Sequence, residues 1–429
     1  MTFDQALEYL SSALKFGINP SLETITELCA GLGNPQRRFE VLQVAGTNGK
    51  SSTARMAAAI LKGQGRSVGL YTSPHLETYT ERIEIGGRKI YPGEFASAFS
   101  RVVPVAEEVL AASGRDGITE FELLTAAAFV AFDRADVDTA VLEVGLGGRW
   151  DATSVCDARV AVVTTIDLDH TERLGTSTGE IAEEKAQIVK ENSTAVVGEL
   201  DSVAWEAIEA RARDVGAALL KLDRDFSYKL SGNRLQIDGV FGSYPDLELS
   251  VLGKYQGENA ALAVVACESL LGAALDLRAL HRALGSLSLP GRLEQLLRIP
   301  PLYIDGAHNP AAAQKLSAWL EERLGGGRII LVVGVLADKD VDGILSALCP
   351  RASTVICTQA QSSRAMPAMQ LAARASKLCD AEVFIHPSVG GAIESAIDAW
   401  RSGDVICVTG SLYTAGEARA AVRGMTMRP

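Results

Sequence analysis

The stretch VAGTNGKSST, residues 44–53, ends an apolar run and precedes an alanine-rich segment with a helical pattern. A buried strand that runs into glycines, a lysine and hydroxyls places backbone N–H groups and a helix N-terminus around one point, which suits phosphate oxygens. Lys50 adds charge there, and Ser52 adds a hydroxyl near a metal ion. The alternative is a serine-capped glycine turn, because Val44 stands where the common Walker spacing needs glycine. The strand–loop–helix context favours a phosphate loop.

Apolar runs of strand length lie on both sides of this loop in the sequence. They are apolar on both faces, and they alternate with helical patterns such as those at 52–64 and 121–134. Strands of this kind belong to a parallel sheet that is covered by helices on each side. The pattern predicts an α/β fold that is doubly wound. The runs in the first half are FEVLQVA (39–45), SVGLYT (67–72), TAVLEVG (139–145) and ARVAVVTTI (158–166).

The length of 429 residues exceeds one ordinary core, so we expect two domains. Residues 225–252 change to short polar strands and turns, which indicates a small antiparallel addition. A long helix is predicted over 256–271, and the alternation of strands and helices restarts after a Pro-Gly break. We therefore predict a first domain over 1–287, which contains the candidate phosphate loop, and a smaller α/β domain over 293–429.

The composition is that of a globular protein, with 47% hydrophobic and 22% charged residues. A formal net charge of −12, without a lysine run, argues against general nucleic-acid affinity. No run of about 18 apolar residues appears, so no membrane segment is expected. The first residues do not have the pattern of a secretory signal. The seven cysteines include no C-x-x-C, which is typical of reduced thiols, and we expect a cytoplasmic protein.

Charged and imidazole side chains follow the ends of two predicted strands. Glu143 lies near the end of one strand, and Asp167, Asp169 and His170 follow the end of the next. In open α/β sheets ligands bind outside the carboxyl ends of the strands, and acidic groups beside a triphosphate hold Mg²⁺ through oxygen. Taken singly, each residue is more simply a helix cap or a satisfied polar group. Together with the loop, they favour metal–nucleotide chemistry.

Lys185 lies in the segment EIAEEKAQIVK, where Ile181, Lys185 and Ile188 share one helical face. Burial lowers the pKa of a lysine, and a neutral amine reacts with carbon dioxide to form a carbamate. On face geometry alone, the favoured interpretation is a lysine that covers apolar surface and reaches water.

The segment GLGGRWDA, residues 145–152, resembles a dinucleotide-binding fingerprint. Trp150 replaces the last glycine of G-x-G-x-x-G, so we reject a dehydrogenase signal. We interpret the glycines as positions where the backbone approaches a ligand, with Arg149 and Asp151 as polar contacts.

Together these motifs resemble the folylpolyglutamate synthase/dihydrofolate synthase family, which is related to the muramyl-peptide ligases. The resemblance runs nearly from end to end. The motifs that carry it in the first half are LGNPQRRFEVLQVAGTNGKSST, YTSPHLETYTERI, TEFELLTAAAF, LEVGLGGRWDAT, TTIDLDHTERLG and IAEEKAQIVK. In the second half they are LPGRLEQL, YIDGAHNPAA, DKD at 338–340 and VTGSLYTAGE.

The resemblance implies an ATP-dependent amide ligase of the Mur-ligase-like fold. ATP would phosphorylate a carboxylate of a pterin substrate, and the amine of L-glutamate would then attack the acyl phosphate. The expected substrates are dihydropteroate, which becomes dihydrofolate, and tetrahydrofolate, which gains further glutamates. The expected cofactor is Mg²⁺, with two ions, and the expected state is a monomer that binds neither nucleic acid nor membrane.

The resemblance also implies roles for single residues. Lys50, Lys185 and His308 would act in catalysis, with His308 reaching the reacting centre from the second domain. Lys185 matches a lysine that is carbamylated in the family and helps to hold a second Mg²⁺. The residues that would contact ATP are Gly46, Thr47, Asn48, Gly49, Lys50, Ser51, Ser52, Asn259, Arg292 and Asp305.

Two further groups follow from the same resemblance. Ser73, Glu143 and His170 would surround one Mg²⁺, with Lys185 as a carbamate at the second. Phe121, Asp151 and Ala152 match the region that binds the pterin.

Three residues keep a structural alternative. His75 lies in a family loop near the substrate, and a structural role is equally supported. His308 is alternatively a turn residue before Asn309-Pro310, and Arg292 a linker arginine in solvent.

The chain departs from the family pattern at four positions. The family commonly has His where this chain has Gln43, and Gly where it has Ser51. It often has Asn where this chain has Ser154, and His where it has Tyr255. Because none of these departures removes a phosphate, metal or reacting group, we expect activity.

Alternatives to a bifunctional enzyme stay open. One alternative is a folylpolyglutamate synthase without dihydrofolate synthase activity, and another is a nucleotide-binding paralogue without catalysis. A muramyl-peptide ligase needs a nucleotide-sugar domain before the phosphate loop, and about 40 residues are too few for such a domain.

Overall fold

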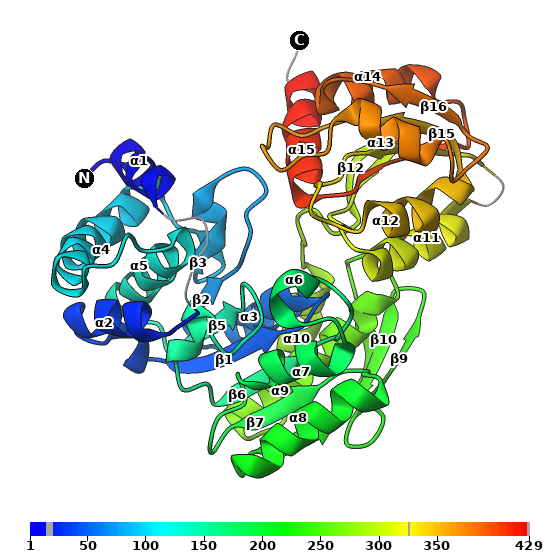
Figure 1. The fold of residues 1–429 in the computed structure, drawn as a ribbon. Coiled ribbons are helices and arrows are strands. Elements are labelled where there is room, and N and C mark those ends of the chain that lie inside the picture. The colour runs from blue at the N-terminus through cyan, green and yellow to red at the C-terminus, as the bar shows by residue number, and fades with distance from the viewer. Residues whose placement is uncertain (14–19, 325–326, 427–429) are drawn as a thin grey trace. The chain divides into compact units, whose positions relative to one another are not determined.

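The computed structural model describes residues 1–13, 20–324 and 327–426 (Figure 1). The chain divides into two compact units. Two short segments that precede residue 288 in the sequence belong to the second unit, so neither unit is one continuous stretch. The first unit consists of Met1–His75, Tyr79–Ser250 and Gly257–Leu287, and the second of Leu76–Thr78, Val251–Gln256 and Ser288–Pro429.

The first unit is built on an eight-stranded sheet with the order β4-β3-β2-β5-β1-β6-β7-β8. The six strands from β2 to β8 in this order are parallel, so their carboxyl ends meet at one edge. This confirms the predicted α/β fold. The strands are β1 Glu40–Ala45, β2 Val68–Tyr71, β3 Ile83–Ile85, β4 Arg88–Lys89, β5 Thr139–Glu143, β6 Val160–Val163, β7 Thr194–Val197 and β8 Ala218–Lys221.

Two antiparallel strands at the edge of this sheet were not among the predicted ones. β3 pairs with β2 and with β4 in antiparallel fashion. Gly86 and Gly87 join β3 to β4 at φ values of 59° and 81°. A two-residue turn with positive φ at both positions matches the twist of a β-hairpin, and glycine adopts it without strain.

The central strands are buried on both faces, as their unbroken apolar runs predicted. On β1, Val41 and Ala45 belong to the cores that contain α5 and α7, while Leu42 and Val44 are buried on the opposite side of the strand. Helix α3 packs against β1, β2 and β5. The helices of the first unit are α1 Phe3–Ser12, α2 Glu23–Gly31, α3 Lys50–Gly63, α4 Pro92–Ser113, α5 Glu120–Arg134, α6 Thr171–Leu174, α7 Thr178–Ala186, α8 Ser202–Asp214 and α10 Leu277–Gly285.

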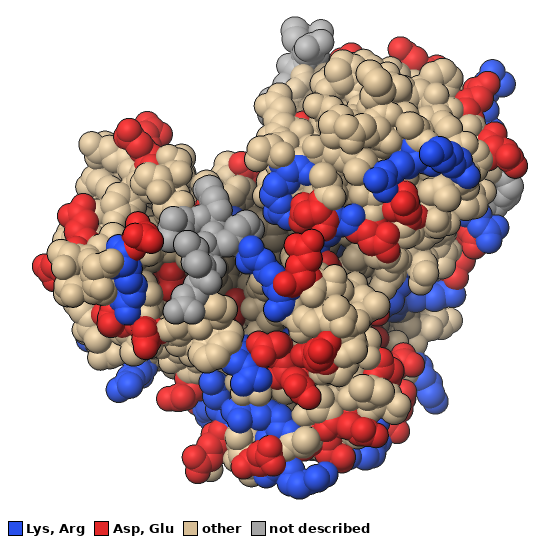
Figure 2. Space-filling model, viewed as in Figure 1, with Lys and Arg blue, Asp and Glu red and all other residues tan. Residues whose placement is uncertain are grey.

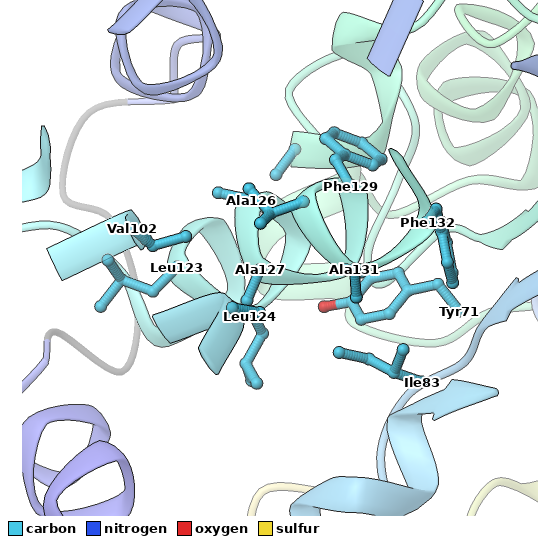
Figure 3. Close-up of a cluster of buried hydrophobic side chains, with 14 of the residues drawn as sticks. Tyr71, Ile83, Val102, Leu123, Leu124, Ala126, Ala127, Phe129, Ala131 and Phe132 are labelled. Atoms are coloured by element: carbon cyan, nitrogen blue, oxygen red, sulfur yellow. The ribbon is translucent and has the colours of Figure 1, made fainter. Parts of the chain in front are cut away.

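Aromatic side chains of α5 form a large part of one core. Figure 3 shows Phe129 and Phe132 of α5 with Tyr71 of β2 in this cluster. A Cβ on Gly69 of β2 would lie 2.5 Å from the ring of Phe132, so only glycine leaves room for that ring on the strand. This packing fixes α5 near the end of β2, where the predicted substrate region begins.

The polar segment that follows β8 forms a separate three-stranded antiparallel sheet, which confirms the predicted antiparallel addition. Its strands are β9 Ser227–Ser231, β10 Arg234–Asp238 and β11 Ser243–Glu248. The buried carboxylate of Glu268, on α9 (Tyr255–Leu271), accepts hydrogen bonds from the backbone N–H groups of Val240 and Phe241. This contact ties the β10–β11 turn to the helix.

The second unit contains a six-stranded sheet with the order β12-β13-β17-β14-β15-β16, in which only β12 is antiparallel to its neighbour. It confirms the predicted second α/β region. The strands are β12 Glu294–Arg298, β13 Pro301–Ile304, β14 Ile329–Val333, β15 Ala352–Cys357, β16 Glu382–Ile385 and β17 Val405–Thr409. The helices are α11 Pro310–Leu324, α12 Val341–Leu348, α13 Ala368–Ala375, α14 Val389–Ala399 and α15 Leu412–Thr426.

The segment Leu76–Thr78 is held in the second unit by apolar and ionic contacts. Leu76 packs against a core of this unit, and its carbonyl oxygen lies 2.2 Å from where a Cβ of Gly416 would stand. The Glu77 carboxylate pairs with Arg419 at 3.3 Å and with Arg423 at 3.1 Å. Glycine at 416 is therefore required for the close approach of this segment.

Two further features of the molecule are the length and hydropathy of its helices and the distribution of charge over one face. In the part of the chain that the structure describes, no helix is both long and apolar enough to cross a membrane. On the face shown in Figure 2, basic and acidic side chains are interspersed.

Candidate active site

The predicted phosphate loop, residues 46–52, follows β1, and its last three residues form the start of α3. Gly46 has a φ of 149°, and a Cβ there would lie 1.9 Å from the hydroxyl oxygen of Thr164. Gly49 has a φ of 88°, and a Cβ there would lie 2.5 Å from Oδ1 of Asn259. Both positions require glycine because of their backbone angle and because of the contact. The N-terminal N–H groups of α3 therefore follow directly on a compact loop.

The end of β6 holds this loop in shape. Thr164 Oγ1 donates to the carbonyl oxygen of Asn48 across 2.6 Å. The Asn48 backbone N–H donates to Thr165 Oγ1 at 3.1 Å, and its side-chain amide donates to Asp167 Oδ2 at 3.1 Å. Asp167, which the sequence placed near the metal, thus contacts the loop through Asn48. These contacts hold the loop in a defined shape, which is the preorganisation that phosphate binding needs.

Two lysines approach the same point of the loop. Nζ of Lys50 donates to the carbonyl oxygens of Gly46 at 2.9 Å and Thr47 at 3.0 Å. Nζ of Lys185 also donates to the Gly46 carbonyl oxygen at 2.9 Å. The two side chains come from α3 and α7, which lie far apart in the sequence.

Burial first, and then the positive charge of Lys50, lower the pKa of Lys185 to about 7, against the opposing effects of Asp169 and Asp151. The side chain of Lys185 is only 4% exposed. The interpretation that Lys185 reaches water was therefore wrong. The helical face was predicted correctly, but face geometry does not reveal that the loop lies over the end of the side chain.

At the end of β5, Glu143 contacts Ser73, which was also predicted to hold a metal ion, and Ser51, which was predicted to contact ATP. It is 1% exposed, and its Oε1 accepts from Ser51 Oγ at 2.6 Å. Its Oε2 accepts from the backbone N–H of Ser73 at 3.0 Å. Because β2, β1 and β5 end at the same sheet edge, residues that follow two of them converge on the carboxylate at the end of the third.

His170 lies after β6 with a φ of 53° and precedes α6. Its backbone N–H donates to Asp169 Oδ1 at 2.8 Å, and its ring nitrogen Nε2 lies 3.9 Å from the same oxygen. Across residues 1–13, 20–324 and 327–426, no three His, Cys, Asp or Glu side chains form a ready group for a metal ion. Glu143 with the hydroxyl of Ser51 nevertheless offers oxygen ligands, which Mg²⁺ and Mn²⁺ prefer.

The three residues predicted to bind a pterin lie around Gly145. A Cβ on Gly145 would lie 2.7 Å from the ring of Phe121 and 3.2 Å from Asp151 Oδ2. Ala152 is buried beside Asp151. Phe121 also contacts Tyr71, with ring centroids 5.8 Å apart. The structure thus brings the three together.

Asp151 is a buried carboxylate surrounded by donors. Oδ2 accepts from the N–H groups of Gly145 at 2.8 Å and Leu146 at 3.0 Å, and Oδ1 accepts from the N–H of Thr153 at 3.0 Å. The Thr153 hydroxyl also donates to Oδ1. Burial raises the pKa of Asp151, and these hydrogen bonds oppose that effect. Asp151 therefore fixes the shape of the loop that starts at residue 145.

Gln43 belongs to this region as well, although in the sequence it stands out only as a departure from a family pattern. Its side-chain amide lies 2.8 Å from Thr153 Oγ1 and 3.0 Å from Ser154 Oγ. A single amide in the otherwise apolar run VLQVA, residues 41–45, was the available signal, because a buried strand tolerates such a group only with partners.

A second cluster lies within the second unit, on the turns before β12 and after β13. The Asp305 carboxylate accepts from the N–H groups of Leu293 and Ala307, each at 2.8 Å. A Cβ on Gly306 would lie 2.4 Å from Nη1 of Arg292, so the guanidinium packs over this glycine. Nδ1 of His308 lies 2.8 Å from the Gly306 carbonyl oxygen. Arg292 is thus not a linker arginine in solvent.

Burial raises the pKa of Asp305, whereas the charge of Arg292 lowers it. Asn259, the remaining residue predicted to contact ATP, belongs to the first unit. Its Oδ1 accepts from Thr53 Oγ1 at 3.4 Å, next to Gly49. Asn259 therefore lies at the phosphate loop.

Family models match both parts of the chain. The model described as Mur ligase middle domain matches residues 44–267, and the model described as Mur ligase, glutamate ligase domain matches residues 291–412. The first match contains the phosphate loop, Glu143, Asp151 and Lys185. The second contains the cluster around Asp305.

The full chain is also similar to single proteins. It is 38% identical to the dihydrofolate synthase/folylpolyglutamate synthase of Mycobacterium tuberculosis, over 94% of this chain and 90% of that protein. Escherichia coli FolC in complex with DHPP and ADP has a TM-score of 0.90 and 31% identity, and the match covers 99% of each chain. The Yersinia pestis bifunctional folylpolyglutamate synthase/dihydrofolate synthase, complexed with AMPPNP and a Mn ion, has a TM-score of 0.87 and 31% identity over 99% of this chain and 98% of that one.

Proposed function

The chain belongs to the dihydrofolate synthase/folylpolyglutamate synthase family of Mur ligases, and we propose that it uses ATP to join L-glutamate both to dihydropteroate and to tetrahydrofolate. It is an ATP-dependent ligase that forms amide bonds. One observation carries the assignment of the reacting region: Glu143 accepts a hydrogen bond from Ser51 of the phosphate loop, where Lys50 and Lys185 both bond to Gly46.

The phosphate loop positions ATP in this proposal. The N–H groups at the start of α3 and the charge of Lys50 attract the phosphate oxygens, because a helix N-terminus carries partial positive charge. Lys50 then exchanges its bonds to the loop carbonyl oxygens for bonds to phosphate. Asn259 holds the loop from the side of α9. In the second unit, Arg292 and Asp305 contact the nucleotide.

A divalent metal ion takes part in the reaction, and we infer that it is Mg²⁺. Glu143 would hold it together with Ser73 and His170, and a carbamate on Lys185 would help to hold a second ion. When bound, Mg²⁺ neutralises charge on the phosphates. The carboxylate of Glu143 and the Ser51 hydroxyl beside it are oxygen ligands that fit this ion.

The reaction has two steps. A substrate carboxylate oxygen attacks the γ-phosphorus of ATP, the bond to the β-phosphate oxygen breaks, and ADP leaves. The amine of L-glutamate then attacks the acyl carbon, and phosphate leaves as the amide forms. Positioning and charge neutralisation provide most of the catalysis of phosphoryl transfer. His308 acts on the reacting centre from the second unit.

Lys185 is suited to form a carbamate. Because burial and Lys50 bring its pKa to about 7, a substantial share of the amine is unprotonated near neutral pH. The free amine adds to carbon dioxide and releases one proton, so a neutral amine becomes a carbamate anion; starting from the ammonium cation, two protons are released in all. Phe121, Asp151 and Ala152 receive the pterin, with the Phe121 ring beside Gly145 as a stacking surface.

The test is ADP release by the purified protein with ATP, Mg²⁺ and L-glutamate, with dihydropteroate in one assay and tetrahydrofolate in another. Glutamate-dependent turnover in both supports the bifunctional assignment. Turnover with tetrahydrofolate alone makes this chain a folylpolyglutamate synthase. No turnover in either, with ATP bound, makes it a nucleotide-binding paralogue.

A further inference from the structure

Two departures from the family pattern, Gln43 and Ser154, contact each other. Gln43 lies on β1 and is 0% exposed, and Ser154 lies in a short 3-10 helix, Ala152–Val155. The amide nitrogen of Gln43 donates to Ser154 Oγ at 3.0 Å and to Thr153 Oγ1 at 2.8 Å. The two residues are 111 positions apart in the sequence. The two departures therefore belong to one hydrogen-bond network.

The Gln43 amide sets the direction of two hydrogen-bond chains. A hydroxyl has one hydrogen, so a hydroxyl that accepts from Gln43 is left to donate elsewhere. The Thr153 hydroxyl donates to Asp151 Oδ1, and the Ser154 hydroxyl donates to the Gly148 carbonyl oxygen at 2.6 Å. The reverse amide orientation would point an oxygen at two hydroxyls whose hydrogens are already used. The surroundings therefore select the nitrogen.

Both chains end on the same loop. Asp151 holds the N–H groups of Gly145 and Leu146, and Ser154 holds the carbonyl of Gly148. On its other side the loop lies against α7: the Arg149 N–H donates to the Glu184 carbonyl oxygen at 3.1 Å. Gln43 thus controls three of the contacts that shape residues 145–148, between β1 and the helix that carries Lys185.

The orientation leaves the Gln43 amide oxygen unsatisfied. Among the residues that the structure describes, Oε1 of Gln43 has no hydrogen-bond partner although it is buried. A buried acceptor without a partner destabilises a fold, and an apolar side chain of the same length would avoid this. The position keeps an amide because its two N–H donors are used.

We propose that Gln43 is a positioning residue for the pterin substrate: its amide donors orient Thr153 and Ser154, and through them Asp151 and the loop 145–148. This inference rests on the proposed function of Asp151. It adds a residue that does not touch substrate but determines how well the pterin pocket is formed. The affinity for the pterin, and not that for ATP, is the property that depends on it.

The experiment compares Gln43→Met, Gln43→Glu and Gln43→His with a matched control, Gln36→Met. Gln36 is also buried with an unpartnered Oε1, but its amide nitrogen donates to Asn34 Oδ1. Kinetics with varied dihydropteroate, ATP and glutamate are measured for each variant, together with thermal unfolding and calorimetric binding of dihydropteroate. Met has no donor, Glu replaces the donor by an acceptor, and His keeps one donor.

We expect Gln43→Met to raise KM and Kd for dihydropteroate by up to about tenfold, the upper range for one lost hydrogen bond between neutral groups, and Gln43→Glu to raise them further. KM for ATP should stay within about twofold of the wild-type value. Gln43→His, which keeps one donor, should raise KM and Kd for dihydropteroate less than Gln43→Met does. Gln36→Met changes no KM. If Gln43→Met does not fold, the inference is tested by comparing Gln43→His with the wild type, again by KM and Kd for dihydropteroate against KM for ATP.

Two results would overturn the inference. One is a folded Gln43→Met protein with unchanged dihydropteroate affinity. The other is an equal rise of KM for all three substrates, which indicates general loosening of the site. A wild-type protein that binds dihydropteroate but does not turn over refutes the proposed function, and its Kd values still test the role of Gln43. A wild type that does not bind dihydropteroate refutes both.

Discussion

The side-chain nitrogens of Lys50 and Lys185 both donate to the carbonyl oxygen of Gly46, each across 2.9 Å. Two ammonium groups at one acceptor repel each other, and burial adds to the cost of charge. The loop carbonyl oxygen partly offsets that repulsion. This arrangement favours any change that removes a positive charge, and Lys185 is the more buried of the two.

The first prediction concerns stability and pH. The pKa of Lys185 is about 7 in the fold and near its ordinary 10.5 when unfolded. Between these values the unfolded chain binds a proton that the folded chain does not, so the contribution of Lys185 to stability increases with pH. Relative to Lys185→Met, the free energy of unfolding of the wild type should rise by up to about 1.4 kcal/mol per pH unit. Urea titrations without metal or carbon dioxide measure it.

The exposed residue Lys315 provides the control for that measurement. The same titrations on Lys315→Met show how much slope any lysine substitution produces. A wild-type minus Lys185→Met difference that is constant from pH 7 to 10 would contradict the burial argument.

The second prediction concerns the carbamate. Lys185→Arg keeps the positive charge but cannot add carbon dioxide, so turnover should fall by about 100-fold or more, with the affinity for ATP changed little. Carbon-13 NMR with labelled bicarbonate should give a carbamate signal in the wild type and none in Lys185→Arg. Full turnover of Lys185→Arg would rule out the role.

The third prediction compares two glycines with the same backbone angle. Gly49 and Gly65 have φ values of 88° and 87°, but a Cβ would meet Asn259 at 2.5 Å only at Gly49. Gly65→Ala should lower the free energy of unfolding by roughly 1 kcal/mol, from backbone strain alone. Gly49→Ala should lower it further and weaken ATP binding at least about tenfold. Equal stability and equal nucleotide affinity in the two variants would show that Asn259 yields freely.

The fourth prediction concerns Glu143. Glu143→Gln retains one oxygen for Ser51 or Ser73 but removes the charge, so the Mg²⁺ concentration for half-maximal turnover should rise about tenfold or more. Activity of the wild type should disappear with EDTA and return with Mg²⁺ or Mn²⁺. Glu268→Gln serves as the control, because Glu268 is also a buried carboxylate and contacts the β10–β11 turn. An unchanged Mg²⁺ requirement in Glu143→Gln would place the metal elsewhere.

Local patterns predicted the parts of the fold that depend on local chemistry. The apolar residues of the run 139–145 predicted a buried strand. The glycines that follow β1 predicted a loop, and Gly46 in this loop has a positive backbone angle φ. The strand-end rule indicated the place of Glu143, and the family motifs placed Ser73 beside it, whereas the hydrogen bond from Ser51 to Glu143 was not predicted. The roles of His308 and Arg292 came only from the resemblance, because nothing in their neighbourhood in the sequence marks them.

Contacts between distant single residues were beyond such reasoning. Gln43 and Ser154 each differ from a family pattern by one side chain, and a pattern read along the chain treats them separately. Their hydrogen bond depends on β1 and the turn after β5 being neighbours in space. In the same way, no pattern in SPHLET shows that Leu76 belongs to the second unit.

The placement of Leu76–Thr78 has a consequence for how the protein is made. A ribosome completes the first unit's residues at Leu287, whereas Gly416, Arg419 and Arg423, which receive Leu76 and Glu77, are synthesised last. The first unit can therefore fold while translation continues, before the residues that contact Leu76 and Glu77 have been synthesised. A nascent chain released at Leu287 would contain the phosphate loop and lack most of the second unit, including His308, which we propose acts on the reacting centre.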